Sequence, residues 1–292
     1  MALAAEASEG ALAPYRAPRR YSFIGLRIHP AHSGVDFFLS LAHNRVVMPS
    51  TAFVAFLACA FVAEVIGTMA GFGAATVLTP IASLFMDIKT AVAVVACFHL
   101  FGNASRISFF RRHIQWGIVG RFGLTGVAMS LAGAQAAAWL SPQHIRLALG
   151  GFLILYVLAE LRRATPSRIP ATTSTLLIGG MASGFIAGLI GTGGAIRSAC
   201  LLAFGLPKEA YIGTSAVIAL LVDATRLPVY LTRQFIPSAY LPMVLSLMGV
   251  AFAGAWMGQR LVRRVSSVRF KQFVLGMLWL MGVKLLWDGW HT

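Results

Sequence analysis

From Thr51 onward, the chain alternates between long apolar runs and short polar or glycine-rich interruptions. A helix that crosses a bilayer needs roughly 20 consecutive, mostly apolar residues. The pattern predicts helical segments at 51–70, 74–86, 89–110, 116–140, 144–161, 173–190, 194–206, 209–231, 238–260 and 268–287. Segments 74–86 and 194–206 are too short to cross, and each directly follows a glycine-rich break. We therefore predict an all-α, polytopic membrane protein.

Composition supports this fold class and locates the chain in the cell (inner) membrane. The sequence is 58% hydrophobic and 11% charged, with a mean hydropathy of +0.78, whereas soluble domains carry roughly 25% charged residues. Its net charge of +15 comes from 24 Lys and Arg against 9 Asp and Glu. These cations lie mainly in the first 48 residues and at segment ends, where they set membrane orientation. We therefore expect no nucleic-acid partner.

The apolar part of the chain divides into two related halves. Residues 1–48 are a polar, arginine-containing arm, which we expect to be mostly disordered. Prolines between 162 and 171 separate a first transmembrane repeat, 49–165, from a second, 166–292. At an offset of 120, Gly71-Phe72-Gly73 aligns with Gly191-Thr192-Gly193, and Asn103-Ala104-Ser105-Arg106 with Asp223-Ala224-Thr225-Arg226. Apolar composition does not explain the polar matches, so we interpret them as a repeat.

Two membrane topologies are compatible with these segments. If each glycine break interrupts a crossing segment, the basic loops fall on both sides of the membrane. If 51–86 and 173–206 each enter and return, most basic loop residues share one side, which the positive-inside rule favours. Each half then has three crossings and the halves are inverted, although the arginine-bearing arm would lie outside. We expect inverted repeats, each with a Gly-broken or re-entrant helix.

The glycine breaks are the first candidate site. A helix that begins inside a membrane exposes unpaired backbone N–H groups and the positive end of its dipole, and both attract anions. Glycine permits positive φ and lets a ligand approach the backbone. The candidate anion-binding glycines are Gly71, Gly73, Gly191, Gly193 and Gly194. Close helix packing is the alternative, and it suits the G-x-x-x-G spacings that begin at positions 67, 184 and 254.

Three charged residues complete the candidate substrate site. Arg197 lies one turn into a short apolar segment, where a charge is costly and faces a partner or an aqueous path. Asp223 and Arg226 share a helix face, so Arg226 could hold an anion while Asp223 orients its guanidinium. The alternatives are structural: Arg197 paired with Asp223 or Glu64, and a purely structural Asp223–Arg226 pair.

Glu64 is a candidate for proton coupling, because a carboxyl group in an apolar run can be protonated reversibly. Structural pairing of Glu64 is the alternative. We interpret His99, which shares a face with Asn103, as a packed, hydrogen-bonded histidine rather than a proton carrier. We expect Arg106 to mark a helix boundary and Tyr230 to be an interfacial residue rather than a hydrogen-bond donor. The cysteines have no metal-ligand or disulfide spacing, and we expect no metal and no cofactor.

The second half carries a family resemblance. Gly191-Thr192-Gly193-Gly194, Leu206-Pro207-Lys208 and Asp223-x-x-Arg226-x-x-x-Tyr230 resemble the motifs of the TauE/SafE sulfite exporter family, or TSUP permeases. The resemblance covers about residues 51–288 and implies a transporter of sulfite, organosulfonates or related small anions. The first half departs from the family's run of glycines at Phe72 and Ala74, so the two breaks are expected to contribute unequally.

We therefore expect a secondary transporter that binds a small anion, sulfite or an organosulfonate, near the membrane midplane and works by alternating access. A carrier of carboxylates or another anion is the first alternative. A non-transport membrane subunit or a membrane-embedded enzyme is the second. The sequence lacks H-E-x-x-H, G-x-S-x-G and G-K-[ST] motifs, so we expect no enzyme. The direction of transport and a homo-oligomeric state stay open.

Overall fold

A computed structural model describes residues 48–70, 73–162, 169–261 and 267–291. The expectation of a disordered arm therefore lies almost wholly outside the described residues. Within them all regular secondary structure is helical, with no strand. Seven of the described helices are long and apolar enough to cross a membrane. The all-α, multi-pass class is confirmed.

The helices of the first half follow the predicted segments closely. They are α2 (Ser50–Ala70), α3 (Ala75–Ala82), α4 (Ile88–Phe110), α5 (Trp116–Trp139) and α6 (Pro142–Leu161), with a 3₁₀ turn at Arg111–His113. The helix α3 is shorter than the predicted 74–86. Asp87 caps α4 because its carboxylate accepts a hydrogen bond from the Lys89 N–H at 2.9 Å.

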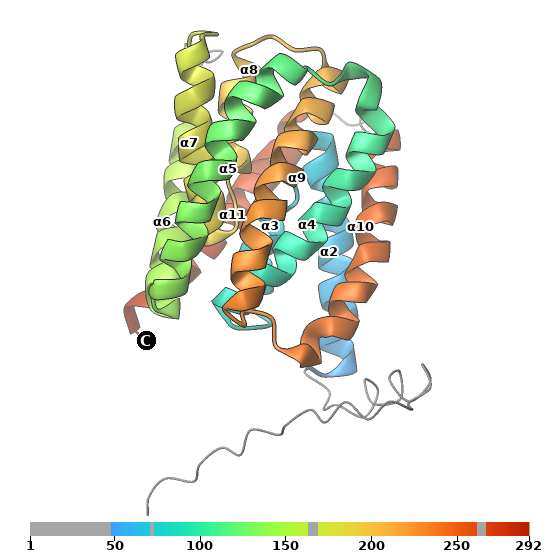
Figure 1. Cartoon of the computed structure of the whole chain (residues 1–292). Coiled ribbons are helices and arrows are strands. Elements are labelled where there is room, and N and C mark those ends of the chain that lie inside the picture. The colour runs from blue at the N-terminus through green and yellow to red at the C-terminus, as the bar shows by residue number, and fades with distance from the viewer. Residues whose placement is uncertain (1–47, 71–72, 163–168, 262–266, 292) are drawn as a thin grey trace, which may run out of the picture. The chain divides into compact units, whose positions relative to one another are not determined.

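The second half repeats this order of long and short helices. It consists of α7 (Thr173–Ile190), α8 (Gly194–Leu202), α9 (Lys208–Thr232), α10 (Leu241–Leu261) and α11 (Ser267–His291), with a 3₁₀ turn at Ser238–Tyr240 (Figure 1). The hydroxyl of Thr172 caps the start of α7 by accepting from the Thr175 N–H at 3.2 Å. Gly191 ends α7 with a left-handed backbone at φ +83°.

The two helices that flank each glycine break pack against each other, α2 with α3 and α7 with α8. Ser183 in α7 donates its hydroxyl to the Gly193 carbonyl at 2.8 Å, and a Cβ on Gly179 would touch the Cys200 side chain. The helix α8 therefore runs back along α7. Likewise, a Cβ on Gly67 would collide with the backbone of Ala74, so the chain reverses after α2. These hairpins match the enter-and-return form of the predicted helices.

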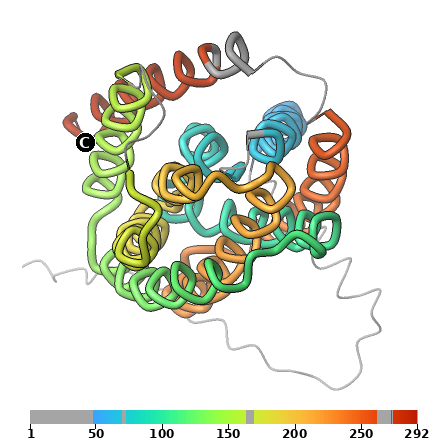
Figure 2. Tube along the Cα trace, turned by 90° about the horizontal axis from the view of Figure 1, so that it is seen from above, coloured from blue at the N-terminus to red at the C-terminus, as the bar shows by residue number. Residues whose placement is uncertain are grey.

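Helices of each half pack against helices of the other half. The helix α5 of the first half packs along α7, and α10 of the second half packs along α2 (Figure 2). The contacts are close because glycine lies at the crossing points. A Cβ on Gly184 would strike the backbone of Gly126, and one on Gly254 would strike Glu64. The expected packing role of the G-x-x-x-G spacings from 184 and 254 is confirmed.

Corresponding helices of the two halves pack against each other and run in opposite directions. In the pair α4 and α9, Asn103 meets Asp223, while Gln115, just after α4, donates its N–H to Thr214 near the start of α9 at 3.0 Å. In the pair α6 and α11, Gln143 at the start of α6 donates to the Gly289 carbonyl at the end of α11 at 2.9 Å. Antiparallel packing of corresponding helices is the relation that an inverted repeat requires.

The central pair α4 and α9 carries half of the buried polar side chains of the described residues. In each of these helices 61% of the most apolar stretch is buried inside the protein, the highest share among the seven candidate membrane spans. The buried polar side chains of this pair are Thr90, His99, Asn103, Arg106, Thr214, Ser215, Asp223 and Arg226. Because buried polar groups need partners, this pair organises the candidate site.

Candidate functional site

The two glycine breaks lie next to each other, although they are distant in sequence. Thr76 at the start of α3 and Thr192 in the second break share a hydrogen bond at 2.7 Å. Gly73 and Gly191 both have positive φ, +89° and +83°, which a side chain would strain. Gly71 lies outside the described residues, so its expected role stays a prediction.

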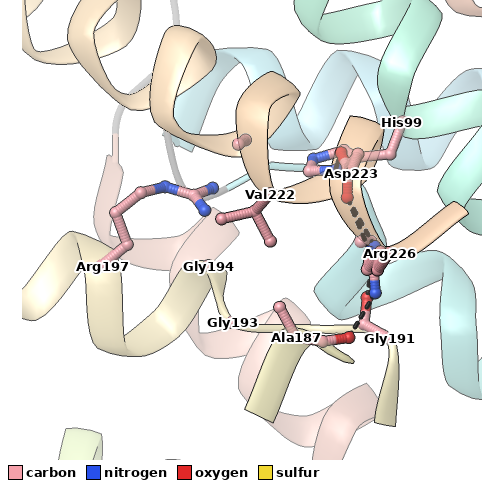
Figure 3. Close-up of a pocket in the computed structure, with 11 residues that line it drawn as sticks. His99, Ala187, Gly191, Gly193, Gly194, Arg197, Val222, Asp223 and Arg226 are labelled. Atoms are coloured by element: carbon pink, nitrogen blue, oxygen red, sulfur yellow. Dashed lines mark hydrogen bonds and ion pairs between the residues drawn. The ribbon is translucent and has the colours of Figure 1, made fainter. Parts of the chain in front are cut away.

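A small pocket opens where α7, α8 and α9 meet α3 and α4 (Figure 3). Its lining residues are Ala75, His99, Ala187, Gly191, Gly193, Gly194, Arg197, Ala219, Val222, Asp223 and Arg226. We call this the central pocket. Six of the residues predicted as substrate-binding line it together, and Gly73 lies beside its His99 and Arg197. Glu64 is not among the lining residues.

Arg226 joins Asp223 to the broken end of α7. Its Nε and Nη2 donate to Asp223 Oδ1 at 2.9 and 2.6 Å. Its Nη1 donates to the Ala187 carbonyl and its Nη2 to the Gly191 carbonyl at 3.3 Å (Figure 3). The Ala187 carbonyl also accepts from the Gly191 N–H at 3.0 Å. The carbonyls that follow it at the helix end lack helical partners, so Arg226 caps α7 through the Gly191 carbonyl. The structural Asp223–Arg226 pair is present, and contact between Arg226 and an anion stays a prediction.

Tyr230 extends this cap by one turn of α9. Its side chain is fully buried, and its hydroxyl donates to the Gly188 carbonyl of α7. The expectation of an interfacial tyrosine is therefore wrong. A buried tyrosine hydroxyl needs a hydrogen-bond partner, and the repeat counterpart Phe110 has no hydroxyl. The difference between phenylalanine at position 110 and tyrosine at the aligned position 230 was the sequence feature that could have indicated this hydrogen bond.

Arg197 reaches the central pocket from the opposite wall. It lies in the first turn of α8, is 3% exposed, and donates its Nε to the Ser215 hydroxyl of α9 at 2.9 Å. Figure 3 shows its guanidinium extending from α8 toward α9. Gly193 caps α8 without a side-chain hydrogen bond, and the first N–H groups of any helix lack helical carbonyls. This wall therefore presents a guanidinium and a positive helix end.

His99 is a pocket residue that the sequence did not identify. Its Nδ1 is 2.7 Å from Asp223 Oδ2, and Asn103 Nδ2 donates to the same oxygen at 3.3 Å. Its Nε2 is buried and has no hydrogen-bond partner among the described residues. A Cβ on Gly73 would collide with this nitrogen. The sequence indicated only that His99 shares a helix face with Asn103. It did not indicate that this face contacts the second half of the chain.

Glu64 lies behind the central pocket, paired with Arg106. Arg106 also donates its Nε to the Thr68 hydroxyl at 3.0 Å and its Nη1 to Asn103 Oδ1 at 2.7 Å. The structural pairing considered for Glu64 is confirmed, and proton coupling through Glu64 stays a prediction. The expected boundary role of Arg106 is wrong, because it lies inside α4 and is 3% exposed.

The aligned arginines Arg106 and Arg226 each tie a central helix to a break helix, but they donate to different kinds of acceptor. In each half an arginine of the central helix reaches the broken helix of its own half. Arg106 reaches side chains of α2, and Arg226 reaches main-chain carbonyls of α7. The first break helix thus supplies its own carboxylate, whereas the second relies on Asp223 of α9.

The buried charges favour an anion. Counted as charged, the buried acidic and basic side chains of the described part of the chain, histidine aside, are the arginines 106, 197 and 226 and the carboxylates Glu64 and Asp223. Their sum is one positive charge, before any charge on His99. Buried charge is costly unless it is balanced, so a bound anion would complete the balance. The described residues hold no group of three His, Cys, Asp or Glu side chains that could bind a metal ion.

Comparison with known proteins relates this architecture to one family. Residues 56–285 match the family model described as sulfite exporter TauE/SafE. A comparison with curated proteins found no match.

Proposed function

Because this chain belongs to the sulfite exporter TauE/SafE family, a family of membrane transporters, we propose that it is a secondary transporter of sulfite or an organosulfonate. The observation that carries the proposal is the wall of the central pocket at α8. There, the Arg197 guanidinium and the positive end of a helix face the same space. Both favour an oxyanion, whose several oxygens can accept from several donors at once.

The proposed substrate site is the central pocket. Gly191, Gly193 and Gly194 allow the anion to approach the backbone, and Arg197 supplies the charge. Asp223 and Arg226 form the opposite side, where the Arg226 guanidinium adds a second positive charge. Gly73, and Gly71 beside it, would close the site from the first break.

Transport would follow from movement of the two halves against each other. The antiparallel packing of α4 with α9, and of α6 with α11, supports inverted repeats. In inverted repeats the two access states are related by exchanging the conformations of the halves. The α2–α3 and α7–α8 hairpins, in contact through Thr76 and Thr192, are the elements that would shift. The pocket would open to one side of the membrane and then the other.

A carboxylate is the second candidate substrate, because it offers the same charge as a sulfonate with planar rather than tetrahedral oxygens. A non-transport subunit or an enzyme is the alternative from another class. Reconstitution of the full chain in proteoliposomes separates them. Sulfite, methanesulfonate and succinate would be compared as substrates, with and without a pH gradient.

We expect uptake of sulfite or methanesulfonate above that of protein-free vesicles, with succinate slower. Faster succinate uptake would support the carboxylate alternative. A folded protein that carries none of the three anions would contradict the proposed transport function.

A further inference from the structure

One nitrogen at the central pocket, His99 Nε2, has no structural role in the hydrogen bonds described above. His99 Nε2 is buried, has no hydrogen-bond partner among the described residues, and belongs to a ring that lines the pocket. The ring is 4% exposed. It does not cap a helix end or join an ion pair through this atom. A buried polar atom without a partner is costly. A ligand of this nitrogen in the central pocket would offset that cost.

The other ring nitrogen determines what Nε2 presents. Asp223 is ionised beside Arg226, and an ionised carboxylate can only accept hydrogen bonds. Nδ1, 2.7 Å from Asp223 Oδ2, therefore carries a proton and donates it. When His99 is neutral, Nε2 presents a lone pair, which repels an anion oxygen. When His99 is protonated, Nε2–H becomes a donor to that oxygen.

The charges around His99 connect its protonation to occupancy of the pocket. Burial of the ring and the cations Arg106 of α4 and Arg197 of α8 oppose the imidazolium, whereas Asp223 of α9 favours it. Arg226 of α9 is paired with Asp223. Glu64 of α2 offsets Arg106 directly, and α3 contributes no charged residue. An anion between Arg197 and His99 would offset the opposing cations. Proton and anion would then each strengthen the binding of the other, as linkage requires.

We propose that His99 and Asp223 form a proton-binding site that fills when an anion occupies the central pocket, so that a proton crosses the membrane with each anion. The inference rests on the transport function proposed above. In the loading step, a hydronium ion in the water on the open side gives its proton to the Nε2 lone pair: its O–H bond breaks, an N–H bond forms, and neutral water is left. After the pocket opens to the other side, this bond breaks and the proton returns to water there as the anion leaves.

The position of Gly73 supports this pairing of proton and anion. A Cβ at Gly73 would point at His99 Nε2 and lie 3.6 Å from Arg197 Nη2. The proton-binding atom and the anion-binding guanidinium therefore approach the same point of the first break. A movement of that break would alter the surroundings of both groups together, which is what coupled release needs.

The test measures protons carried per anion in proteoliposomes of the full chain that contain a pH-sensitive dye. Methanesulfonate and sulfite are the probes, and methanesulfonate is decisive because it stays unprotonated near neutral pH. We expect wild-type vesicles to acidify by about one proton per anion taken up. In His99→Gln the ratio for any residual flux should fall to the level of protein-free vesicles. The control is His144→Gln, which changes an exposed histidine at the start of α6 and should keep the wild-type ratio.

Wild-type anion uptake without acidification would overturn this inference alone, as would His99→Gln uptake with the wild-type ratio. Absence of anion uptake by the wild type would instead contradict the transport function itself. If His99→Gln carries no anion, the inference is tested instead by the protonation of His99, measured by NMR in wild-type protein labelled with ¹⁵N-histidine. Protonation that rises on addition of methanesulfonate supports the inference, and a ring that stays neutral overturns it.

Discussion

Asn103 and Asp223, which align with each other at an offset of 120 residues in the sequence, are hydrogen-bonded to each other at 3.3 Å. In the inverted repeat proposed above, corresponding residues of the two halves would meet near the axis that relates the halves. This contact therefore marks the centre of the helix arrangement, between α4 and α9. The polar side chains run outward from it on both sides, to Arg106 and Glu64 in one half and to Arg226 in the other.

The same contact shows how the halves differ. Asn103 is neutral, whereas Asp223 is a carboxylate that accepts from Asn103, His99 and Arg226. The charge at the axis thus comes from the second half, which also supplies Arg197 and most of the pocket lining. The first half contributes His99 and the backbone of Gly73. This division fits the sequence difference between the two glycine breaks.

Gly191→Ala should destabilise the protein. The backbone there has φ +83°, and a Cβ would meet Val92 and Thr79 at 3.2 and 3.3 Å. Strain of this kind costs about 1–3 kcal/mol, so the thermal unfolding midpoint in detergent should fall. The matched control is Gly151→Ala within α6, where a Cβ meets open space and helix propensity favours alanine by about 1 kcal/mol. Equal midpoints for both variants would contradict the assigned turn.

Glu64 and Arg106 should behave as one unit in unfolding measurements. Glu64→Ala leaves the buried guanidinium of Arg106 without its carboxylate, a loss of about 3–5 kcal/mol. Arg106→Ala should cost a similar amount, and the double variant should cost clearly less than the sum of the two. Additive effects would contradict the ion pair.

Glu64→Gln separates the two candidate proton carriers. If His99 carries the proton, the number of protons per anion should stay at the wild-type value. If Glu64 carries it, this ratio should fall.

Thr76→Cys combined with Thr192→Cys should lock the two breaks together on oxidation. The hydroxyl oxygens of these threonines are 2.7 Å apart, which brings the corresponding sulfur atoms within reach of a disulfide. If the hairpins must move apart for alternating access, oxidation should stop anion flux and reduction should restore it. Each single cysteine variant, treated with the same oxidant, is the control for the native cysteines. Undiminished flux in fully cross-linked protein would show that this movement is not needed.

Local chemistry explains what the sequence could predict. The bounds of α7 follow from a threonine cap at Thr172 and a left-handed glycine at Gly191, both readable from neighbouring residues. The candidate residues Gly191, Gly193, Gly194 and Arg197 could be singled out from the sequence because they belong to a local break in an apolar run. Asp223 and Arg226 were found because they are one helical turn apart.

What could not be predicted depends on tertiary contacts. Glu64 and Arg106 are 42 residues apart, and nothing local indicates that α2 and α4 bring them together. His99 and Asp223 are 124 residues apart and belong to different halves. Their contact exists because α4 and α9 pack antiparallel at the centre, which the hydrophobic pattern does not encode.

Sulfite flux in Arg197→Ala proteoliposomes tests the central claim most directly. Loss of a charged hydrogen-bond donor to the anion costs up to about 3 kcal/mol, so flux at subsaturating sulfite should fall roughly 100-fold. Arg233→Ala, which removes an exposed arginine just after α9, is the control and should transport at the wild-type rate. Both variants should elute as folded protein. Wild-type flux in a folded Arg197→Ala protein would contradict the assignment of the anion site to the central pocket.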